Sequence, residues 1–237
     1  SLFSEILTYN DYAGRLLAEG GISSKRIRTI GNSLDSAKHR QMRSTLKDTD
    51  IFTSHFGNDD PVLLYCGRIQ QSKRLDLMID AALALKQEGK SVNLVFVGKD
   101  DENVCLQQLA EAKGRGDAVW LYGPCYDEEK LAELFYNSTL CVSPGNVGLT
   151  AIHALSFGCP VITHNIFPYQ GPEFEAIRPG ITGDFFKQDN AQSLADTIRQ
   201  WLNRTPEQRK ETASAAFAEV DAKWNVDYQI GVFKTVL

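Results

Sequence analysis

The run Val62-Leu63-Leu64-Tyr65-Cys66, followed by Gly67 and Arg68, is the clearest structural signal in the chain. Five apolar residues in succession are expected of a strand that is covered on both faces of a parallel sheet. Ser72 then stands where it could cap a helix. That helix is indicated by apolar residues at helical spacing, namely Leu75, Met78, Ile79, Ala82 and Leu83. The segment therefore predicts a strand, a short loop and a helix.

The same alternation continues toward the C-terminus. Further strands are predicted at Val92–Val97, Ala118–Leu121, Leu140–Val142 and Val161–Thr163, and further helices at Val104–Ala112, Glu128–Tyr136 and Leu149–Phe157. Gly158 is predicted to end the last of these helices, and the chain after Ala191 is predicted to be mostly helical with a break near Thr205-Pro206. Strands and helices that alternate with short connections predict an α/β fold with a doubly wound, Rossmann-like parallel sheet.

The chain before this region predicts a smaller unit. Ile6–Tyr9 is expected to be a short strand, and residues 40–60 are polar without a clear period, as in a linker or surface segment. The predicted division therefore places residues 1–55 in a remnant of an N-terminal domain with its crossing, and residues 56–237 in the main domain. The chain starts with Ser rather than Met, and we expect it to be part of a longer protein.

Composition limits the classes of function. The 237 residues are 43% hydrophobic and 23% charged, which is typical of a globular chain with a real core. The net charge of −5 argues against nucleic acid as a partner, because sequence-independent binding of nucleic acid needs positive charge. The longest apolar runs are too short to cross a bilayer. Five cysteines without a CxxC spacing are expected to be small buried hydrophobic residues in a reducing compartment.

Candidate binding residues follow the predicted strands. Ligands of doubly wound sheets bind at the carboxyl ends of the strands, so the loops at 67–72, 98–101, 123–127, 143–148 and 164–175 are the candidates. Arg68 and Lys73 could clamp a diphosphate, the arginine as a fork and the lysine as a point charge, with roughly 1.5–3 kcal/mol for each charge-assisted bond. The alternative is that both are solvated surface cations.

A second loop, Ser143-Pro144-Gly145-Asn146-Val147-Gly148-Leu149, also lies between a strand and a helix. Its glycines would let a ligand approach the backbone, and the amides of Gly148, Leu149 and Thr150 would face an anion. The alternative is a tight turn that needs glycines for geometry alone.

Three further side chains are weaker candidates. His153, one helical turn further on, is expected to face the same crevice. Glu173 and Glu175 are expected to be ordinary surface carboxylates.

Taken together, these motifs resemble the family-4 retaining glycosyltransferases of GT-B fold, from about Ile6 to the C-terminus. The matching pieces are Ile30-Gly31-Asn32-Ser33-Leu34-Asp35, Tyr65-Cys66-Gly67-Arg68 with Lys73, Val97-Gly98, Gly148-Leu149, Gly158-Cys159-Pro160 and Pro172-Glu173-Phe174-Glu175. The resemblance implies that residues 56–237 are the donor-binding, C-terminal half of the GT-B fold. It implies transfer of a sugar with retention, from a nucleoside diphosphate sugar to a glycan or lipid-linked acceptor, without a metal or other cofactor.

The resemblance also implies the donor-binding residues. It assigns the diphosphate to Arg68, Lys73 and the amides of the Gly148 loop, and the wall beside the base to the loop from Tyr122 to Tyr126. The full set is Arg68, Lys73, Gly98, Tyr122, Tyr126, Asn146, Gly148, Leu149, Thr150, His153 and Glu175. No catalytic base or nucleophile is assigned, since the acceptor side belongs to the missing N-terminal domain. The resemblance further implies a cytoplasmic protein, with peripheral association at the inner face of the membrane as an additional option.

One departure from the family affects the predicted function. The family usually has two glutamates seven residues apart, whereas this chain has Gly145 and His153. His153 is expected to take over the ribose contact, and Asn146 part of the sugar contact. Two alternatives remain open, a degenerate non-catalytic nucleotide-binding or scaffold module, and a GT-B nucleotide-sugar epimerase.

Overall fold

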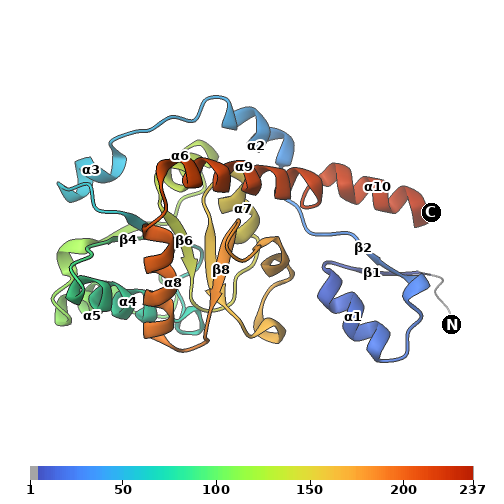
Figure 1. The fold of residues 1–237 in the computed structure, drawn as a ribbon, viewed down its shortest axis with the longest axis horizontal. Helices are drawn as coiled ribbons and strands as arrows, with labels where there is room; N and C mark the ends of the chain where they lie inside the picture. Colours follow the sequence, from blue (N-terminus) through green and yellow to red (C-terminus); the bar gives the residue numbers. More distant parts are fainter. Residues whose placement is uncertain (1–4, 237) are drawn as a thin grey trace.

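The computed structural model describes residues 5–236, and its main body is a six-stranded parallel sheet between two layers of helices (Figure 1). The strand order is β5-β4-β3-β6-β7-β8. The strands are β3 (Val62–Cys66), β4 (Asn93–Val97), β5 (Val119–Gly123), β6 (Leu140–Ser143), β7 (Val161–His164) and β8 (Gly183–Phe186). The predicted α/β fold with a doubly wound parallel sheet is confirmed. The edge strand β8 was not predicted, because it is short, begins at a glycine and lacks a long apolar run.

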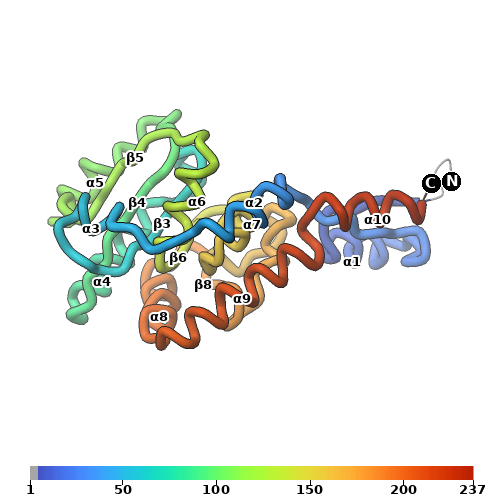
Figure 2. Tube along the Cα trace, turned by 90° about the horizontal axis from the view of Figure 1, so that it is seen from above, coloured from blue at the N-terminus to red at the C-terminus, as the bar shows by residue number. Residues whose placement is uncertain are grey.

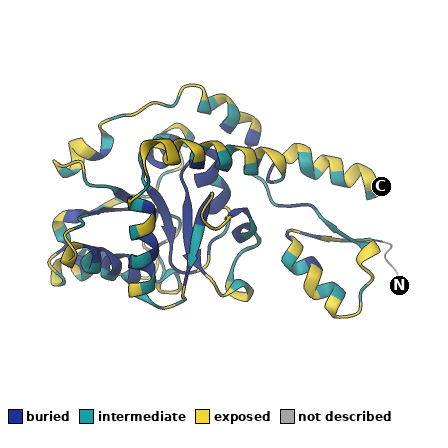
Figure 3. Cartoon of the chain, in the orientation of Figure 1, coloured by how far each residue is buried: buried dark blue, intermediate teal, exposed yellow. Residues whose placement is uncertain are grey.

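Two apolar cores cover the two faces of the sheet. Along β3, Leu64 packs into one core and Leu63 and Tyr65 pack into the other, as the alternation of side chains along a strand requires. The first core includes α6 (Glu128–Asn137), α7 (Thr150–Ser156) and α9 (Pro206–Ala222), and the second includes α4 (Asp76–Gln87), α5 (Leu106–Ala112) and α8 (Ala191–Leu202). Figure 3 shows that burial is concentrated in these strands. A strand buried on both faces explains why the apolar run at residues 62–66 is continuous.

A small N-terminal unit lies beside the C-terminal helix. It consists of β1 (Ile6–Thr8), α1 (Asp11–Glu19) and β2 (Ile27–Thr29), and its two strands are parallel. The helix α10 (Val226–Val236) extends over this unit (Figure 2), and Tyr228 donates its hydroxyl to the carbonyl of Thr29 at 3.3 Å. The predicted strand at Ile6–Tyr9 is thus confirmed, whereas the division at residue 55 remains a prediction and residues 1–4 lie outside the described chain.

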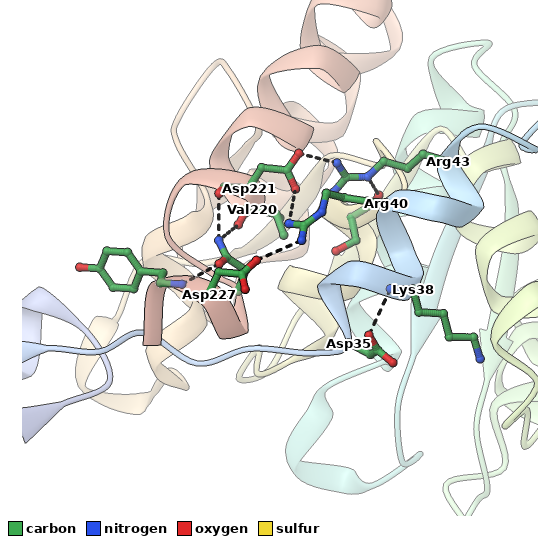
Figure 4. A network of polar contacts seen from close by, with 10 residues as sticks. Asp35, Lys38, Arg40, Arg43, Val220, Asp221 and Asp227 are labelled. Atoms are coloured by element: carbon green, nitrogen blue, oxygen red, sulfur yellow. Dashed lines mark hydrogen bonds and ion pairs between the residues drawn. The ribbon is translucent and has the colours of Figure 1, made fainter. Parts of the chain in front are cut away.

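The segment predicted as a linker contains two short helices, α2 (Ser36–Arg43) and α3 (Ile51–Phe56). Polar contacts rather than an apolar stripe hold α2 in place, so the pattern of hydrophobic residues does not reveal it (Figure 4). Asp35 caps α2, and Arg43 donates to Asp221 on α9 and to the carbonyl of Ser156, both at 2.7 Å. Residues 40–60, predicted as a linker or surface segment, thus contain the end of α2 and all of α3.

Two predicted helix ends have different outcomes. Gly158 follows α7 with φ +77 and donates its N–H to the carbonyl of Leu155, which confirms it as the terminating glycine. The predicted cap at Ser72 was wrong, because Ser72 lies in a 3₁₀ turn and Arg74 turns the chain with φ 50 before α4 begins.

Two other sequence-based expectations concern membranes and thiols. No helix within residues 5–236 has both the length and the apolar character needed to cross a membrane. All five cysteines are free. Cys105 is exposed, whereas the sequence led us to expect it to be buried.

Candidate functional site

The loops after β3 and β6 are in direct backbone contact at the carboxyl edge of the sheet. Gly145 donates its N–H to the carbonyl of Lys73 at 2.9 Å, and a Cβ atom on Gly145 would lie 2.5 Å from the carbonyl oxygen of Ser72. Thr150 adds a second link, since its hydroxyl donates to the carbonyl of Cys66 at 3.0 Å. The structure thus brings together the two loops that the sequence singled out.

The loop after β7 completes this arrangement. Val147 donates its N–H to the side chain of Gln170 at 2.7 Å, and Gly171 donates its N–H to the carbonyl of Val147 at 2.9 Å. Thr163 donates its hydroxyl to the carbonyl of Ser143 at 2.8 Å. Hydrogen bonds therefore join three strand-end loops that are distant in the sequence.

Gly98 has a clear packing role at the same edge. A Cβ atom at this position would overlap the carbonyl oxygen of Gly67, at 1.8 Å, so only glycine lets the ends of β3 and β4 come this close. Gly67 itself has φ +149. This geometry accounts for both glycines without a ligand, and the predicted donor contact of Gly98 stays a prediction.

Two cations meet at this edge without a carboxylate to balance them. Lys73 donates from Nζ to Oδ1 of Asn146 at 2.6 Å and to the carbonyl of Asn146 at 3.2 Å. Burial of Lys73 and the positive charge of Arg68 both lower the pKa of Lys73 from its ordinary value. Within residues 5–236 neither cation has a carboxylate oxygen within 4.0 Å. The two charges repel each other, so an anion placed between them would be stabilised.

Free backbone donors lie next to these cations. The N–H groups of Gly148, Leu149 and Thr150 donate to no acceptor in the described part of the chain, and α7 begins at Thr150 as the sequence predicted to within one residue. Unpaired backbone donors need water or a ligand. Together with Lys73 they form a surface that suits an anion with several oxygens.

His153 is engaged by protein side chains. Its Nε2 lies 2.8 Å from Oε1 of Glu128, and its ring stacks on that of His39 with centroids 5.2 Å apart and an angle of 7°. Nε2 of His39 lies 2.7 Å from the same oxygen. His153 and then His39 lower the pKa of Glu128 to about 2. The sequence did not reveal this cluster, because its residues lie far apart and carry no motif.

The two glutamates of the last loop differ from the expectation of surface carboxylates. Glu175 accepts the N–H groups of Asp11 and Tyr12 at 2.8 and 2.6 Å, so it caps α1 of the N-terminal unit. Glu173 is only 3% exposed and accepts from Asn32 at 2.7 Å, while its Oε2 has no hydrogen-bond partner among residues 5–236. The expectation of surface exposure was wrong for Glu173.

The aromatic residues of the loop after β5 are placed differently from each other. Tyr122 packs against Trp120 with ring centroids 5.1 Å apart, whereas Tyr126 is 89% exposed at the loop tip. Leu149 is 39% exposed beside the free amides. Whether these residues touch a ligand, as the resemblance implies, stays a prediction.

One sizeable cavity lies away from these loops. A cavity of about 570 Å³ lies between β2 and α10 and is lined by Asp11, Arg28, Tyr228 and others. Its wall carries one acidic side chain, Asp11, and one basic side chain, Arg28. The strand-end loops offer two cations and free N–H groups instead, so they are the better candidate site for an anion.

The family model and the relatives that match this chain are all glycosyltransferases. The model of the family described as glycosyl transferases group 1 matches residues 47–218. The chain is 25% identical over 189 residues to alpha-D-kanosaminyltransferase of Streptomyces kanamyceticus, covering 76% of this chain and 47% of that protein. It is 32% identical over 175 residues to D-inositol 3-phosphate glycosyltransferase of Mycobacteroides abscessus, covering 66% of this chain and 38% of that protein.

A similar solved structure is that of Anabaena HepE in complex with UDP. It superposes with a TM-score of 0.76 at 19% identity, over 98% of this chain and 63% of that one. The chain spans about half the length of the curated relatives it matches.

Proposed function

The chain belongs to the glycosyl transferases group 1 family, and we propose that it binds the diphosphate of a nucleotide sugar between Arg68, Lys73 and the loop at Gly148. The similar structure of Anabaena HepE, which was solved with UDP and with UDP-glucose, supports this proposal. The nucleoside would extend toward the loop from Tyr122 to Tyr126, and Gly98, Asn146, Leu149 and Thr150 would line the same crevice.

The observation that carries the proposal is the pair of cations without a balancing carboxylate. A diphosphate would relieve the repulsion between Arg68 and Lys73, which already lowers the pKa of Lys73 in addition to burial. Asn146 holds Nζ of Lys73 in place, so little side-chain entropy is lost when an anion binds. Arg68, which is exposed, remains free to reach around a phosphate as a bidentate donor.

The same groups would assist transfer of the sugar. As the bond between the anomeric carbon and the diphosphate oxygen breaks, negative charge grows on the leaving diphosphate. Donors that are already in position stabilise this charge more than they stabilise the intact donor, which lowers the barrier. We propose that the longer protein transfers the sugar with retention to a glycan or lipid-linked acceptor bound by another domain. That the transfer needs no metal and takes place in the cytoplasm, at the inner membrane face for a lipid-linked acceptor, belongs to the same proposal.

A binding experiment on this chain tests the donor site. Calorimetry with UDP, GDP, ADP and other nucleoside diphosphates should find one that binds. Lys73→Met should weaken its binding roughly 10- to 150-fold, since one charge-assisted hydrogen bond contributes about 1.5–3 kcal/mol. Lys99→Met is the matched control, because Lys99 also follows a strand but pairs with Asp101 at 2.9 Å. The proposal fails if no nucleoside diphosphate binds at millimolar concentration, or if Lys73→Met and Arg68→Gln both bind like the unmodified chain.

A non-catalytic module is the second candidate, because Gly145 and His153 replace the two glutamates of the family that the sequence resembles. Steady release of nucleoside diphosphate by the longer protein in the presence of an acceptor extract would exclude it. Conversion of the nucleotide sugar without any acceptor would instead identify an epimerase.

A further inference from the structure

Three side chains that can bind metal ions meet outside the proposed diphosphate crevice. His39 comes from α2, Glu128 is the first residue of α6, and His153 comes from α7. One ligand atom of each lies within 4.8 Å of the others. Both imidazoles direct Nε2 at the same carboxylate oxygen, at 2.7 and 2.8 Å. The ligand atoms of three helices that are distant in the sequence therefore converge on one point.

The protein itself does not supply a hydrogen bond for every polar atom of this cluster. Nε2 of His153, which is directed at the shared oxygen, is buried and makes no hydrogen bond of acceptable geometry within residues 5–236, in spite of its short distance to Glu128. The side chain of His153 is only 13% exposed, so water has little access to this nitrogen. A buried polar atom without a partner is costly and needs an explanation.

We propose that His39, Glu128 and His153 form a binding site for a divalent transition-metal ion, with Zn²⁺ as the preferred occupant. Two imidazoles and a carboxylate suit zinc, which takes such ligands at about 2.0–2.2 Å and about 3.3 Å from each other in tetrahedral geometry. The two distances from the imidazole nitrogens to the carboxylate oxygen, 2.7 and 2.8 Å, would have to lengthen by about half an ångström to admit the ion. Glu128 is 26% exposed, so water can supply the fourth ligand from that side.

The ion would act as a structural link between the crossing segment and the sheet domain. Helix α2 is otherwise held by the packing of Met42 and of the His39 ring against the core, and by polar contacts such as that of Arg43 with Asp221 (Figure 4). A bond from His39 to a shared ion would fix α2 on α6 and α7. This role does not involve the diphosphate and does not depend on the proposed transferase activity.

Metal titration of the chain tests the site directly. After treatment with a chelator, calorimetry with Zn²⁺ should show one equivalent bound, and Co²⁺ should give the visible absorption of a tetrahedral site. His39→Gln, Glu128→Gln and His153→Ala should each weaken the binding of Zn²⁺ by roughly tenfold or more and abolish the Co²⁺ spectrum. His55→Gln is the matched control, because His55 stacks on Trp120 and lies outside the cluster.

The outcomes separate the proposal from its alternatives. Circular dichroism and urea unfolding without metal show whether each variant is folded, and the isosteric Glu128→Gln gives a second variant should His39→Gln not fold. Equal Zn²⁺ binding by folded Glu128→Gln and by the unmodified chain would show an adventitious ion elsewhere and overturn the proposal. Absence of binding at millimolar Zn²⁺ would show that the cluster is held by hydrogen bonds alone, which also overturns it.

Discussion

Gly145 donates its backbone N–H to the carbonyl of Lys73 at 2.9 Å, and the two loops are so close that no side chain fits between them. A Cβ atom on Gly145 would lie 2.5 Å from the oxygen of Ser72 and 2.7 Å from Cα of Lys73. The position where the resembling family has a glutamate is therefore closed by backbone contact. The close contact between the loops requires glycine at position 145. The same contact therefore explains why this chain lacks the glutamate that the resembling family has there.

Gly145→Ala should force the loops after β3 and β6 apart. Since the overlapping atoms are backbone, the expected cost is about 1–3 kcal/mol of the free energy of unfolding, as for other overpacked sites. The affinity for nucleoside diphosphate should fall as well, because Lys73 would move. Urea unfolding and calorimetry measure both effects. Gly231→Ala is the control, since within residues 5–236 no atom lies within 4 Å of its Cβ position apart from its chain neighbours and its own helix backbone. Equal stability of the two variants would contradict the packing argument.

Asn146→Ala should weaken nucleotide binding through Lys73. Asn146 accepts from Nζ at 2.6 Å, and loss of one such hydrogen bond that positions a cation corresponds to about 1 kcal/mol, or roughly fivefold in affinity. Asn203→Ala is a matched control, because Asn203 accepts from Lys90 at 3.1 Å far from the crevice. If both variants bind nucleotide like the unmodified chain, Asn146 does not position Lys73 for the ligand.

Glu175→Gln should loosen the N-terminal unit. Glu175 accepts two backbone N–H groups at the start of α1, and glutamine keeps only one acceptor oxygen and loses the charge that favours a helix N-terminus. The expected loss is about 1 kcal/mol, visible as faster hydrogen exchange in α1. The exposed Glu207→Gln should leave this exchange unchanged. A fall in nucleotide affinity with unchanged exchange would instead favour the donor contact that the family resemblance implies.

His164 should make the folded chain less stable in mild acid. Burial lowers the pKa of His164, which is 2% exposed, and its Nδ1 accepts the N–H of Ile166 at 3.2 Å. Below the ordinary pKa of about 6.5 the unfolded chain takes up a proton that the folded chain refuses. The stabilisation is complete above that pH and is lost as the pH falls toward the lower pKa of the folded state.

Urea unfolding between pH 5 and 8 measures this effect. His164→Asn, which retains an acceptor for the N–H of Ile166, should show a smaller change of unfolding free energy with pH than the unmodified chain. Identical pH dependence of the two proteins would exclude a role for His164, and the difference between them removes the contribution of the other histidines.

Local patterns in the sequence were enough to predict the sheet and the meeting of the loops after β3 and β6. The run from Val62 to Cys66 predicts a strand buried on both faces, and the glycines and cations that follow such strands must meet at one edge, since parallel strands place all their carboxyl ends together. For the same reason the closeness of Lys73 to the Gly145–Gly148 loop could be anticipated. These features depend on short-range periodicity and on the topology that it implies.

The partners of individual side chains could not be read in this way. Glu173 was expected at the surface but is buried, and the sequence did not reveal that Glu175 accepts the first N–H groups of α1 or that His153 lies against Glu128 and His39. The donor contacts predicted for Glu175 and His153 stay predictions. Helix α2, which carries His39, has no apolar stripe and is placed by salt bridges to α9. Such contacts join residues about 25 to 180 positions apart, and they form only when the chain has packed, because no short-range pattern specifies which charged groups will meet.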